Sequence, residues 1–312
     1  MKKKKLKFFT IKVLAKHLLI SEDFLLSLKR NHRYDYYHRA RVTRGKKREL
    51  YDAKPKLKKV LKQIDKKILD VIPLPDQFQG GIKGKSLRTN AERHVKKQAI
   101  LKIDIKDFFP SISPDKVFKA FKKLQWSDEC AEIISILTTV REPSPHLPQG
   151  FSTSPKVAAL VLIDFERRLH YLAERYNWKY TFWVDDITIS GNLPVLKFKN
   201  TIVKILKSEG FDVRSNKIDT LTSNMQLIVN SVVVNQFPNI PRKKRNEIKD
   251  ELYYIQKFGP RNHLSRKGIA ATEESIIKLK NHLLGNIHFV MGINKNLGNK
   301  YKNDFLSINW AE

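Results

Sequence analysis

The sequence predicts an α+β protein in which helices surround a small antiparallel sheet that carries acidic side chains. β-branched and aromatic residues flank the pair Asp185-Asp186 on both sides, and Gly191 closes the second run, as in a tight β-hairpin. A further run, from Ala99 to Ile105, alternates apolar and charged residues as a strand does. Most of the remaining chain places apolar residues at helical spacing.

The acidic side chains of these strands form a candidate metal site. Adjacent carboxylates such as Asp185 and Asp186 repel each other, and a divalent cation would remove that repulsion. An ordinary acidic turn is the alternative for this pair alone, since Asp is common in turns. Asp104 lies near the end of its strand, where its carboxylate can meet the pair. Three such carboxylates can hold two Mg²⁺ ions, an arrangement suited to phosphoryl or nucleotidyl transfer.

The composition favours a polyanionic partner. The chain has 61 Lys and Arg against 31 Asp and Glu, a formal net charge of +30 over 312 residues. Nucleic acid is the default partner of so basic a protein. A membrane-surface protein is the alternative, but no run of about 18 apolar residues and no signal-peptide core occurs. The single cysteine, Cys130, excludes an internal disulfide and a cysteine-based zinc site, so we expect a cytoplasmic protein.

The first third of the chain is predicted to be helical around one basic turn. Residues 1–40 are expected to be helical, with Ser21 as the N-cap of a helix that begins at Glu22. A basic β-turn is expected within 41–58, followed by a helix that ends before Pro73.

The rest of the chain alternates strands and helices and then becomes helical. A glycine-rich basic loop covers 80–86, and the segment from about 99 to 235 holds the strands. Asn239 to Pro241 is predicted to be a hinge, before a basic and largely helical segment, 242–312. The helices expected among the strands span about 114–125, 128–140, 155–176 and 195–209.

Several motifs in a fixed order resemble the palm motifs of reverse transcriptases. They are Leu101 to Phe109 (LKIDIKDFF), Leu147 to Pro155 (LPQGFSTSP), Phe182 to Asp186 (FWVDD), Gly210-Phe211 and Asn216-Lys217. The segment Asn90-Ala91-Glu92-Arg93-His94 resembles the Asn-Ala-Xaa-Xaa-His signature of bacterial retron reverse transcriptases. The resemblance covers roughly residues 40–235 well.

Two departures from the family pattern leave part of the assignment open. Trp183 stands where similar enzymes carry Tyr, and Val229-Asn230-Ser231 stands where retron enzymes carry Val-Thr-Gly. That second motif is associated with recognition of the cognate RNA. Another bacterial reverse transcriptase (defence-associated, diversity-generating or group II intron-like) therefore stays an alternative.

The resemblance implies a right-hand polymerase, an α+β fold with fingers, an antiparallel palm sheet and a helical thumb. The implied parts are an N-terminal helical extension (1–40), fingers (41–98 and about 114–145), a palm with the catalytic carboxylates (99–113 and 146–238), and a basic helical thumb (239–312).

The resemblance also implies catalytic roles. Asp104 and Asp185 would bind both metal ions, Asp186 would be a weaker or water-mediated ligand, and the main-chain carbonyl of Ile105 an extra one. The ions would be Mg²⁺, with Mn²⁺ as a substitute. Asp107 is expected to have a structural or hydrogen-bonding role.

A nucleotide pocket is implied beside the metals. Phe109, five positions after Asp104, matches the aromatic steric gate that excludes a 2′-OH, whereas Phe108 is expected in the core. Gln149 and Gly150 would line the pocket. Arg48, with Lys46 or Lys47, would grip the triphosphate, and Lys217 would protonate pyrophosphate. A solvated charge run and a surface lysine are the alternative interpretations.

RNA contacts are expected at three further places. Asn90 and His94 would contact template or structured RNA, unless the histidine is structural. Tyr253, Tyr254 and Phe258 would stack on bases, or else belong to the thumb core. Phosphate contacts are expected from four consecutive cations, Arg242, Lys243, Lys244 and Arg245.

Together these implications describe an RNA-directed DNA polymerase. It would copy part of a structured noncoding RNA into single-stranded DNA (msDNA) from dNTPs, beside an effector protein of an anti-phage defence system. A catalytically silent RNA-binding scaffold is one alternative, against which the complete carboxylate trio argues. An RNA-dependent RNA polymerase is another, against which Phe109 argues.

Overall fold

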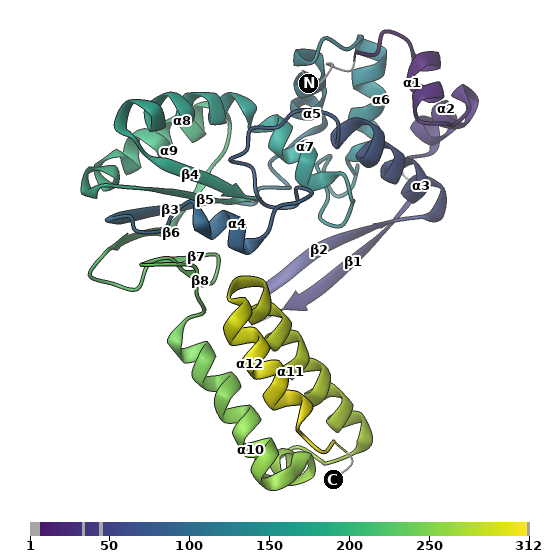
Figure 1. The fold of residues 1–312 in the computed structure, drawn as a ribbon. Helices are drawn as coiled ribbons and strands as arrows, with labels where there is room; N and C mark the ends of the chain where they lie inside the picture. The colour runs from purple at the N-terminus through teal and green to yellow at the C-terminus, as the bar shows by residue number, and fades with distance from the viewer. Residues whose placement is uncertain (1–6, 33–34, 44–45, 311–312) are drawn as a thin grey trace. The chain divides into compact units, whose positions relative to one another are not determined.

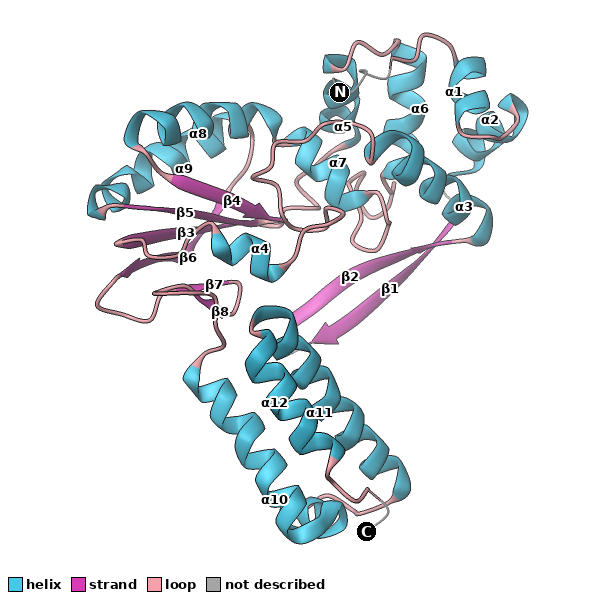
Figure 2. Ribbon diagram, viewed as in Figure 1, coloured by secondary structure: helices cyan, strands magenta, loops and turns pink. Residues whose placement is uncertain are grey.

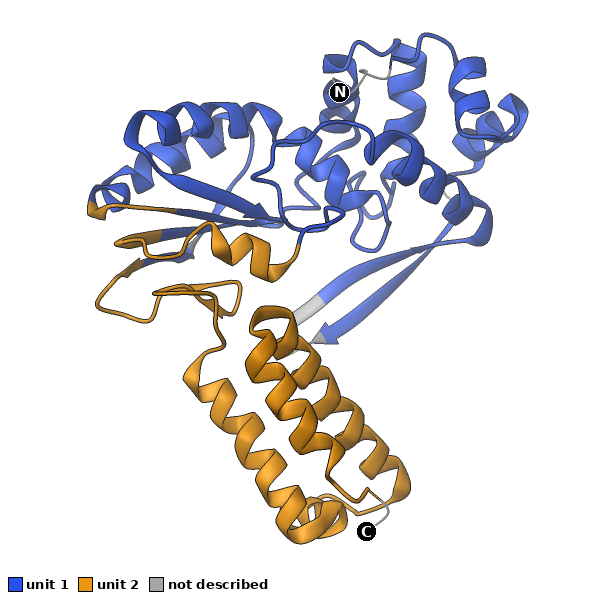
Figure 3. Cartoon of the chain, viewed as in Figure 1, with its two compact units in different colours: residues 1–85, 101–189, 194–220 blue, residues 86–100, 190–193, 221–312 orange. Residues whose placement is uncertain are grey.

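The computed structural model describes residues 7–32, 35–43 and 46–310, which divide into two compact units (Figure 3). Unit 1 comprises Met1–Lys85, Leu101–Ile189 and Pro194–Thr220, and unit 2 comprises Ser86–Ile100, Ser190–Leu193 and Leu221–Glu312. Each unit combines segments that are distant in the sequence.

A four-stranded sheet in the order β4-β5-β3-β6 is the centre of unit 1 (Figure 2). Ile105 N–H donates to the Asp185 carbonyl and Gln98 N–H to that of Gly191, so β3 and β5 run antiparallel. Bonds from Lys106 to Asp212 and from Ser223 to Gln98 show the same for β3 and β6. The predicted antiparallel sheet is confirmed. Its strands are β3 (Ala99–Ile105), β4 (Lys179–Trp183), β5 (Asp186–Gly191) and β6 (Val213–Thr222).

Helices cover one face of this sheet (Figure 1). They are α8 (Ile163–Tyr176) and α9 (Lys199–Ser208), the latter preceded by the 3-10 helix η3 (Leu193–Phe198). Phe165 of α8 meets Phe182 of β4 edge-on at 6.0 Å between ring centroids. The helix expected over 155–176 is wrong as one element: it is α7 (Ser154–Val161) and then α8, broken at the buried Leu162. No glycine or proline marks that break.

The remaining helices of unit 1 begin at residues that the sequence marks well. Ser21 accepts a hydrogen bond from Phe24 N–H at 3.2 Å, which confirms it as an N-cap. Ser113 and Ser127 cap later helices in the same way. The elements are α1 (Ile11–His17), α2 (Glu22–Asn31), α3 (Pro55–Ile64), the π-helix η2 (Asp65–Leu69), α5 (Pro114–Lys123) and α6 (Asp128–Thr138).

A long hairpin joins these helices. It pairs β1 (Tyr36–Thr43) with β2 (Lys46–Ala53), from Tyr36 opposite Ala53 to Thr43 opposite Lys46. The expectation of helix up to residue 40 is therefore wrong at its end. Cross-strand pairing fixes Tyr36 to Ala40 as strand, and local sequence does not carry that information.

Unit 2 packs three long helices on a short helix and a small hairpin. Its buried core includes Ala91, Val229, Leu252, Leu283 and Tyr301. No helix among the described residues is long and apolar enough to cross a membrane. The elements are α4 (Leu87–Glu92), β7 (Ile228–Val229), β8 (Val232–Val233), α10 (Arg242–Arg266), α11 (Glu273–Ile293) and α12 (Lys295–Leu306).

Candidate active site

The turn between β4 and β5 holds the acidic pair in a strained backbone. Val184 has a φ of 61°, a left-handed conformation that a β-branched residue adopts only when its surroundings impose it. Gln79 and Gly80 N–H groups both donate to the Phe182 carbonyl, at 2.9 and 3.1 Å. A Cβ on Gly80 would lie 2.5 Å from Val184 N. Segment 77–80 therefore packs against the turn and holds its backbone in place.

The third carboxylate lies on the neighbouring strand. The hydrogen bond from Ile105 N–H to the Asp185 carbonyl, 3.1 Å long, places Asp104 beside the hairpin tip. Asp104 is 8% exposed, and Asp185 and Asp186 are half-buried. The structure thus brings together the three carboxylates that the sequence predicted. The main chain of Ile105 lies at the same point, and its role as a ligand stays a prediction.

Burial and neighbouring negative charge raise the pKa values of both aspartates of the hairpin. Burial, with the neighbouring Asp185 and Asp104 carboxylates, raises the pKa of Asp186 to about 6. Burial is also the main cause of a raised pKa at Asp185, with Asp104 contributing. The carboxylates therefore repel one another where water screens them poorly, and a cation would relieve that repulsion.

Two cations on β6 contact Asp104. Lys217 Nζ donates to Asp104 Oδ2 at 3.0 Å, and Arg214 Nε lies 3.4 Å from Oδ1. Arg214 also donates to Asp107 Oδ1 at 3.0 Å, which confirms the hydrogen-bonding role expected of Asp107. Sequence reasoning missed Arg214, because a residue three positions from Lys217 would lie on the opposite face of a regular strand.

The donor set fits Mg²⁺. All three side chains supply oxygen, the ligand that this ion prefers. Asp104 Oδ1 is buried without a hydrogen-bond partner among the residues that the structure describes. Among these same residues, no group of three or more His, Cys, Asp or Glu side chains is arranged so that it could hold a metal ion. Asp104 is instead in an ion pair with Lys217.

The residues predicted to form the nucleotide pocket also belong to unit 1. Phe109 is half-buried next to Phe108, with ring centroids 5.6 Å apart. Phe108 is only 4% exposed, which confirms it as a core residue. The Gln149 carbonyl accepts a 2.8 Å hydrogen bond from Tyr51 N–H. A Cβ on Gly150, whose φ is 124°, would lie 2.3 Å from the Tyr51 carbonyl oxygen, so glycine is required there.

This contact ties the Gln149-Gly150 loop to β2, the strand of the predicted triphosphate cations. Arg48 on β2 is exposed. Lys46 and Lys47 belong to β2, but their side chains lie outside the described part of the chain. Trp183, the departure from the family's Tyr, ends β4 and is half-buried.

The expectation of RNA contacts at Asn90 and His94 is corrected. Both side chains are 0% exposed inside unit 2, so they offer no surface to RNA. Asn90 Nδ2 donates to Asn230 Oδ1 at 2.7 Å, and His94 Nδ1 lies 2.7 Å from Ser190 Oγ. Burial, with lesser effects of Arg93 and Lys97, lowers the pKa of His94 to about 3, so its ring is neutral. This motif holds unit 2 together.

The four cations expected to bind phosphate form the first turn of α10. Arg242 and Lys243 are exposed, whereas Arg245 is half-buried and its carbonyl accepts from Tyr301 Oη at 3.3 Å. This first turn has no acidic residue. Cations at a helix N-terminus oppose the helix dipole, so the arrangement is unfavourable unless an anion binds there.

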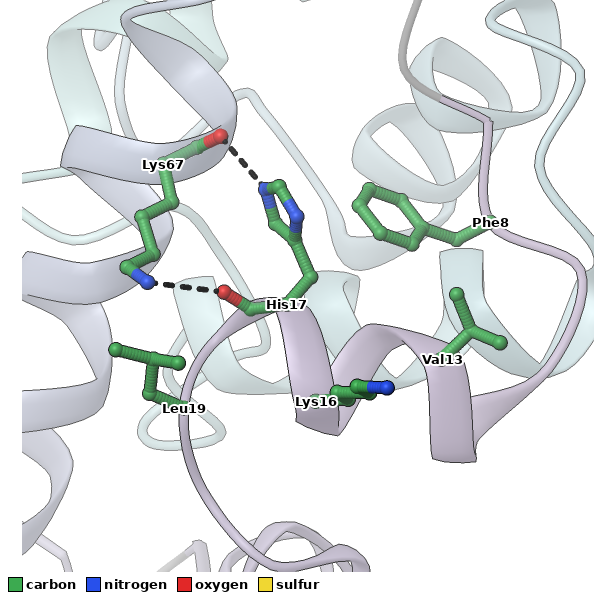
Figure 4. Close-up of a pocket in the computed structure, with 6 residues that line it drawn as sticks. All are labelled: Phe8, Val13, Lys16, His17, Leu19 and Lys67. Carbon is green, nitrogen blue, oxygen red and sulfur yellow. Dashed lines mark hydrogen bonds between the residues drawn. The ribbon is translucent and has the colours of Figure 1, made fainter.

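One cavity lies away from the carboxylates. It has a volume of about 540 Å³, and Phe8, Val13, His17 and Leu19 are among its lining residues (Figure 4). Figure 4 shows His17 Nε2 at 3.0 Å from the Lys67 carbonyl and Lys67 Nζ donating to the His17 carbonyl at 3.2 Å. These bonds join α1 to η2. None of the predicted site residues lines this cavity.

The fold is that of a right-hand polymerase, with carboxylates on an antiparallel sheet. Residues 40–255 match the family described as reverse transcriptase (RNA-dependent DNA polymerase), and the chain belongs to that family. The chain is also similar to several retron reverse transcriptases. It is 29% identical over 226 residues to the retron Mx65 reverse transcriptase of Myxococcus xanthus, covering 67% of this chain and 53% of that protein.

A second curated relative agrees. The chain is 31% identical over 211 residues to the retron Ec86 reverse transcriptase of Escherichia coli, covering 67% of this chain and 65% of that one. The chain thus spans between half and two thirds of the length of these two curated relatives. A solved foamy viral protease-reverse transcriptase in complex with double-stranded DNA has a TM-score of 0.43 at 17% identity, covering 82% of this chain and 36% of that one.

Proposed function

We propose that this protein is an RNA-directed DNA polymerase that binds a structured noncoding RNA and copies part of it into single-stranded DNA. The observation that carries the proposal is the meeting of Asp104, Asp185 and Asp186, where burial and then the neighbouring carboxylates raise the pKa of Asp185 and Asp186. Such a cluster is costly to fold and is suited to binding divalent cations.

The side chains have separable roles in this proposal. Asp104 and Asp185 would hold both ions, with Asp186 as a weaker or water-mediated ligand and the Ile105 carbonyl as an extra one. Bound Mg²⁺, or Mn²⁺ in its place, would activate the attacking hydroxyl and neutralise the leaving pyrophosphate. Lys217, whose ammonium group lies 3.0 Å from Asp104, would protonate that pyrophosphate.

Substrate selection rests on neighbouring residues. Phe109 excludes a ribose 2′-OH, so dNTPs are used. Gln149 and Gly150 line the nucleotide pocket, and Arg48 with Lys47 binds the triphosphate through charge-assisted hydrogen bonds. Support comes from the 2.8 Å bond between Tyr51 and Gln149, which joins the two segments.

The proposal also covers the partners of the protein and its biological setting. The net charge of +30 and the cationic first turn of α10 support binding to RNA. The similarity to retron enzymes supports an msDNA product, a cytoplasmic complex and an effector protein in anti-phage defence.

One observation favours a second candidate, a different bacterial reverse transcriptase. Asn230 and Ser231 form the β7–β8 turn with φ of 44° and 69°, where retron enzymes carry Thr-Gly. A glycine would adopt this backbone more easily than Ser231 does. A neighbouring noncoding RNA with inverted repeats would favour the retron, and its absence would favour the second candidate.

The experiment is to purify the protein from cells that carry its own locus and to sequence the nucleic acid bound to it after separate RNase and DNase treatment. We expect one short RNA joined to a defined single-stranded DNA. The Asp185→Asn/Asp186→Asn variant should retain the RNA and lack the DNA, and Asp107→Asn is the matched control. DNA in the double variant would disprove the proposal. Heterogeneous RNA without DNA in the wild type would disprove the retron assignment.

A further inference from the structure

Helix α10 is broken near its C-terminal end, and the break opens a cavity. Gly259 has a φ of 77° and a ψ of 158°, and Pro260 follows it. The cavity beside them has a volume of about 390 Å³ and lies in unit 2. That volume is within the range of about 300–1,000 Å³ typical of small-ligand sites. The break is therefore a candidate binding site rather than a packing defect.

Amide side chains line this cavity. Gln256, Asn262 and Asn309 are among its lining residues. Gln256 Nε2 donates at 2.8 Å to both the Asp304 carbonyl and Ser307 Oγ, which fixes the amide and leaves its Oε1 as an acceptor. Asn262 Nδ2 donates to the Phe258 carbonyl at 2.9 Å. Amides held in this way suit the polar groups at the edge of a nucleobase.

Aromatic rings stand next to the amides on the outer face of α10. Tyr253 and Tyr254 are 51% and 45% exposed, so they do not belong to the core. The inward face is formed by Leu252 and Ile255, which are buried. Tyr254 and the half-buried Phe258 are nearly parallel, with 16° between their planes. Such exposed rings are large apolar surfaces that indicate a binding partner.

Two cations complete the group. Arg266 lies over the Phe258 ring at 4.0 Å, and Lys257 Nζ lies 5.4 Å from the same ring centroid. Rings for stacking, cations for phosphate and amides for base edges are together what an unpaired nucleotide requires. The rings alone would also suit a protein partner, but the cations and amides beside them suit a nucleotide better.

We propose that the break in α10 binds unpaired nucleotides of the RNA. A base stacks on Tyr254 and Phe258, the amides read its edge, and Lys257 and Arg266 hold the adjoining phosphate. This inference rests on the proposed function for its ligand, the RNA. It adds a site that selects loops over paired stems, which the cationic first turn of α10 cannot do because phosphate contacts carry no sequence information.

The test uses the full chain, freed of nucleic acid, and two synthetic probes. One is an RNA hairpin with 2-aminopurine in its loop, and the other is a blunt, fully paired RNA of the same length. We expect tighter binding of the hairpin and quenching of 2-aminopurine, because stacking on a ring quenches it. Tyr254→Ala should weaken hairpin binding about tenfold and restore the fluorescence.

Matched variants separate the contributions. Phe258→Leu should weaken hairpin binding and restore the fluorescence, as Tyr254→Ala does. If Phe258→Leu does not fold, the result for Tyr254→Ala decides the test. Lys257→Gln should weaken both probes and lower the salt dependence by about one counterion. Tyr171→Ala removes a ring that is 67% exposed in unit 1 and should change nothing. Equal hairpin affinity and equal quenching in the wild type and Tyr254→Ala would overturn the inference. That result is expected if the rings bind a protein instead of RNA.

DNA synthesis on poly(rA) primed with oligo(dT) distinguishes the two proposals. An inactive wild type that still quenches the loop probe would disprove the proposed polymerase and leave the nucleotide site standing. An active wild type whose Tyr254→Ala variant binds the hairpin unchanged would disprove the nucleotide site alone.

Discussion

The carboxylate hairpin of unit 1 and the Asn90–His94 segment of unit 2 both come from motifs that resemble those of reverse transcriptases, yet their environments are opposite. In the hairpin, burial and the neighbouring carboxylates raise the pKa of Asp186 to about 6. In the segment, burial lowers the pKa of His94 to about 3 and keeps the ring neutral. Side chains of the first region repel one another, and those of the second bond to their own unit.

The difference separates a reactive site from a structural one. A repelling cluster lowers stability and gains from a bound cation, whereas a buried neutral cluster raises stability and gains nothing. Changes in the hairpin should therefore alter catalysis and leave stability nearly intact. Changes around Asn90 should do the reverse.

The largest expected effect is on catalysis by Asp185→Asn. Loss of this charge should reduce DNA synthesis by about 10³-fold, which is ~4 kcal/mol of transition-state stabilisation. The melting temperature should stay the same or rise, because repulsion is relieved. Single-turnover primer extension and thermal unfolding check both. Asp107→Asn, beside the site and bonded to Arg214, is the control and should stay within a few-fold of wild type.

Gly80→Ala should act on catalysis through the turn. Its Cβ would lie 2.5 Å from Val184 N and 2.8 Å from the Trp183 carbonyl carbon, so the hairpin tip must shift. A displacement of about 1 Å can reduce a rate by about 10²-fold. Primer extension measures this. Gly285→Ala in α11, where a Cβ meets nothing within 4 Å, should leave the rate unchanged. Full activity of Gly80→Ala would show that segment 77–80 does not hold the turn in place.

Asn90→Ala should lower stability rather than catalysis. It removes the 2.7 Å hydrogen bond from the buried Asn90 to the half-buried Asn230, which costs about 1 kcal/mol. Urea unfolding should detect the loss, while the rate per folded molecule stays unchanged. The exposed Asn281→Ala should change stability by less than about 0.5 kcal/mol. A specific loss of RNA binding in Asn90→Ala, with normal stability, would restore the role that the sequence first indicated.

Acidification should destabilise the protein through His94. The unfolded state binds a proton near pH 6.5, but the folded state does not until pH falls to about 3. The stabilisation is therefore complete above pH 6.5 and is lost below it, by up to ~2 kcal/mol at pH 5. His94→Gln should flatten the urea-unfolding profile between these pH values, and exposed His288→Gln should not. An unchanged profile in His94→Gln would contradict the buried, neutral ring.

Local signals in the sequence predicted much of this structure. Ser21 caps its helix, and the hairpin strands end where Gly191 indicates. Asp104 falls beside Asp185 because strand length and alternation determine where both lie. The family motifs supplied the rest of the fold, since no periodicity distinguishes a palm sheet from another antiparallel sheet.

The misses all depend on contacts between distant segments. The strand at Tyr36 exists through its pairing with Ala53, and the support of the turn comes from residues 77–80, about a hundred positions earlier. Burial of Asn90 likewise follows from packing of α4 against β8 and α11, and His94 contacts the distant Ser190. A polar motif in a sequence does not tell whether its side chains face a ligand or the core.

The most direct test of the account is a Mg²⁺ titration of protein freed of nucleic acid, followed by thermal unfolding. At about 100 times the dissociation constant, Mg²⁺ should stabilise the wild type by ~2.7 kcal/mol. Asn90→Ala should show the same increment from a lower starting point, and Asp186→Asn should lose most of it. Equal stabilisation of wild type and Asp186→Asn, or none in the wild type, would contradict a metal site at the hairpin.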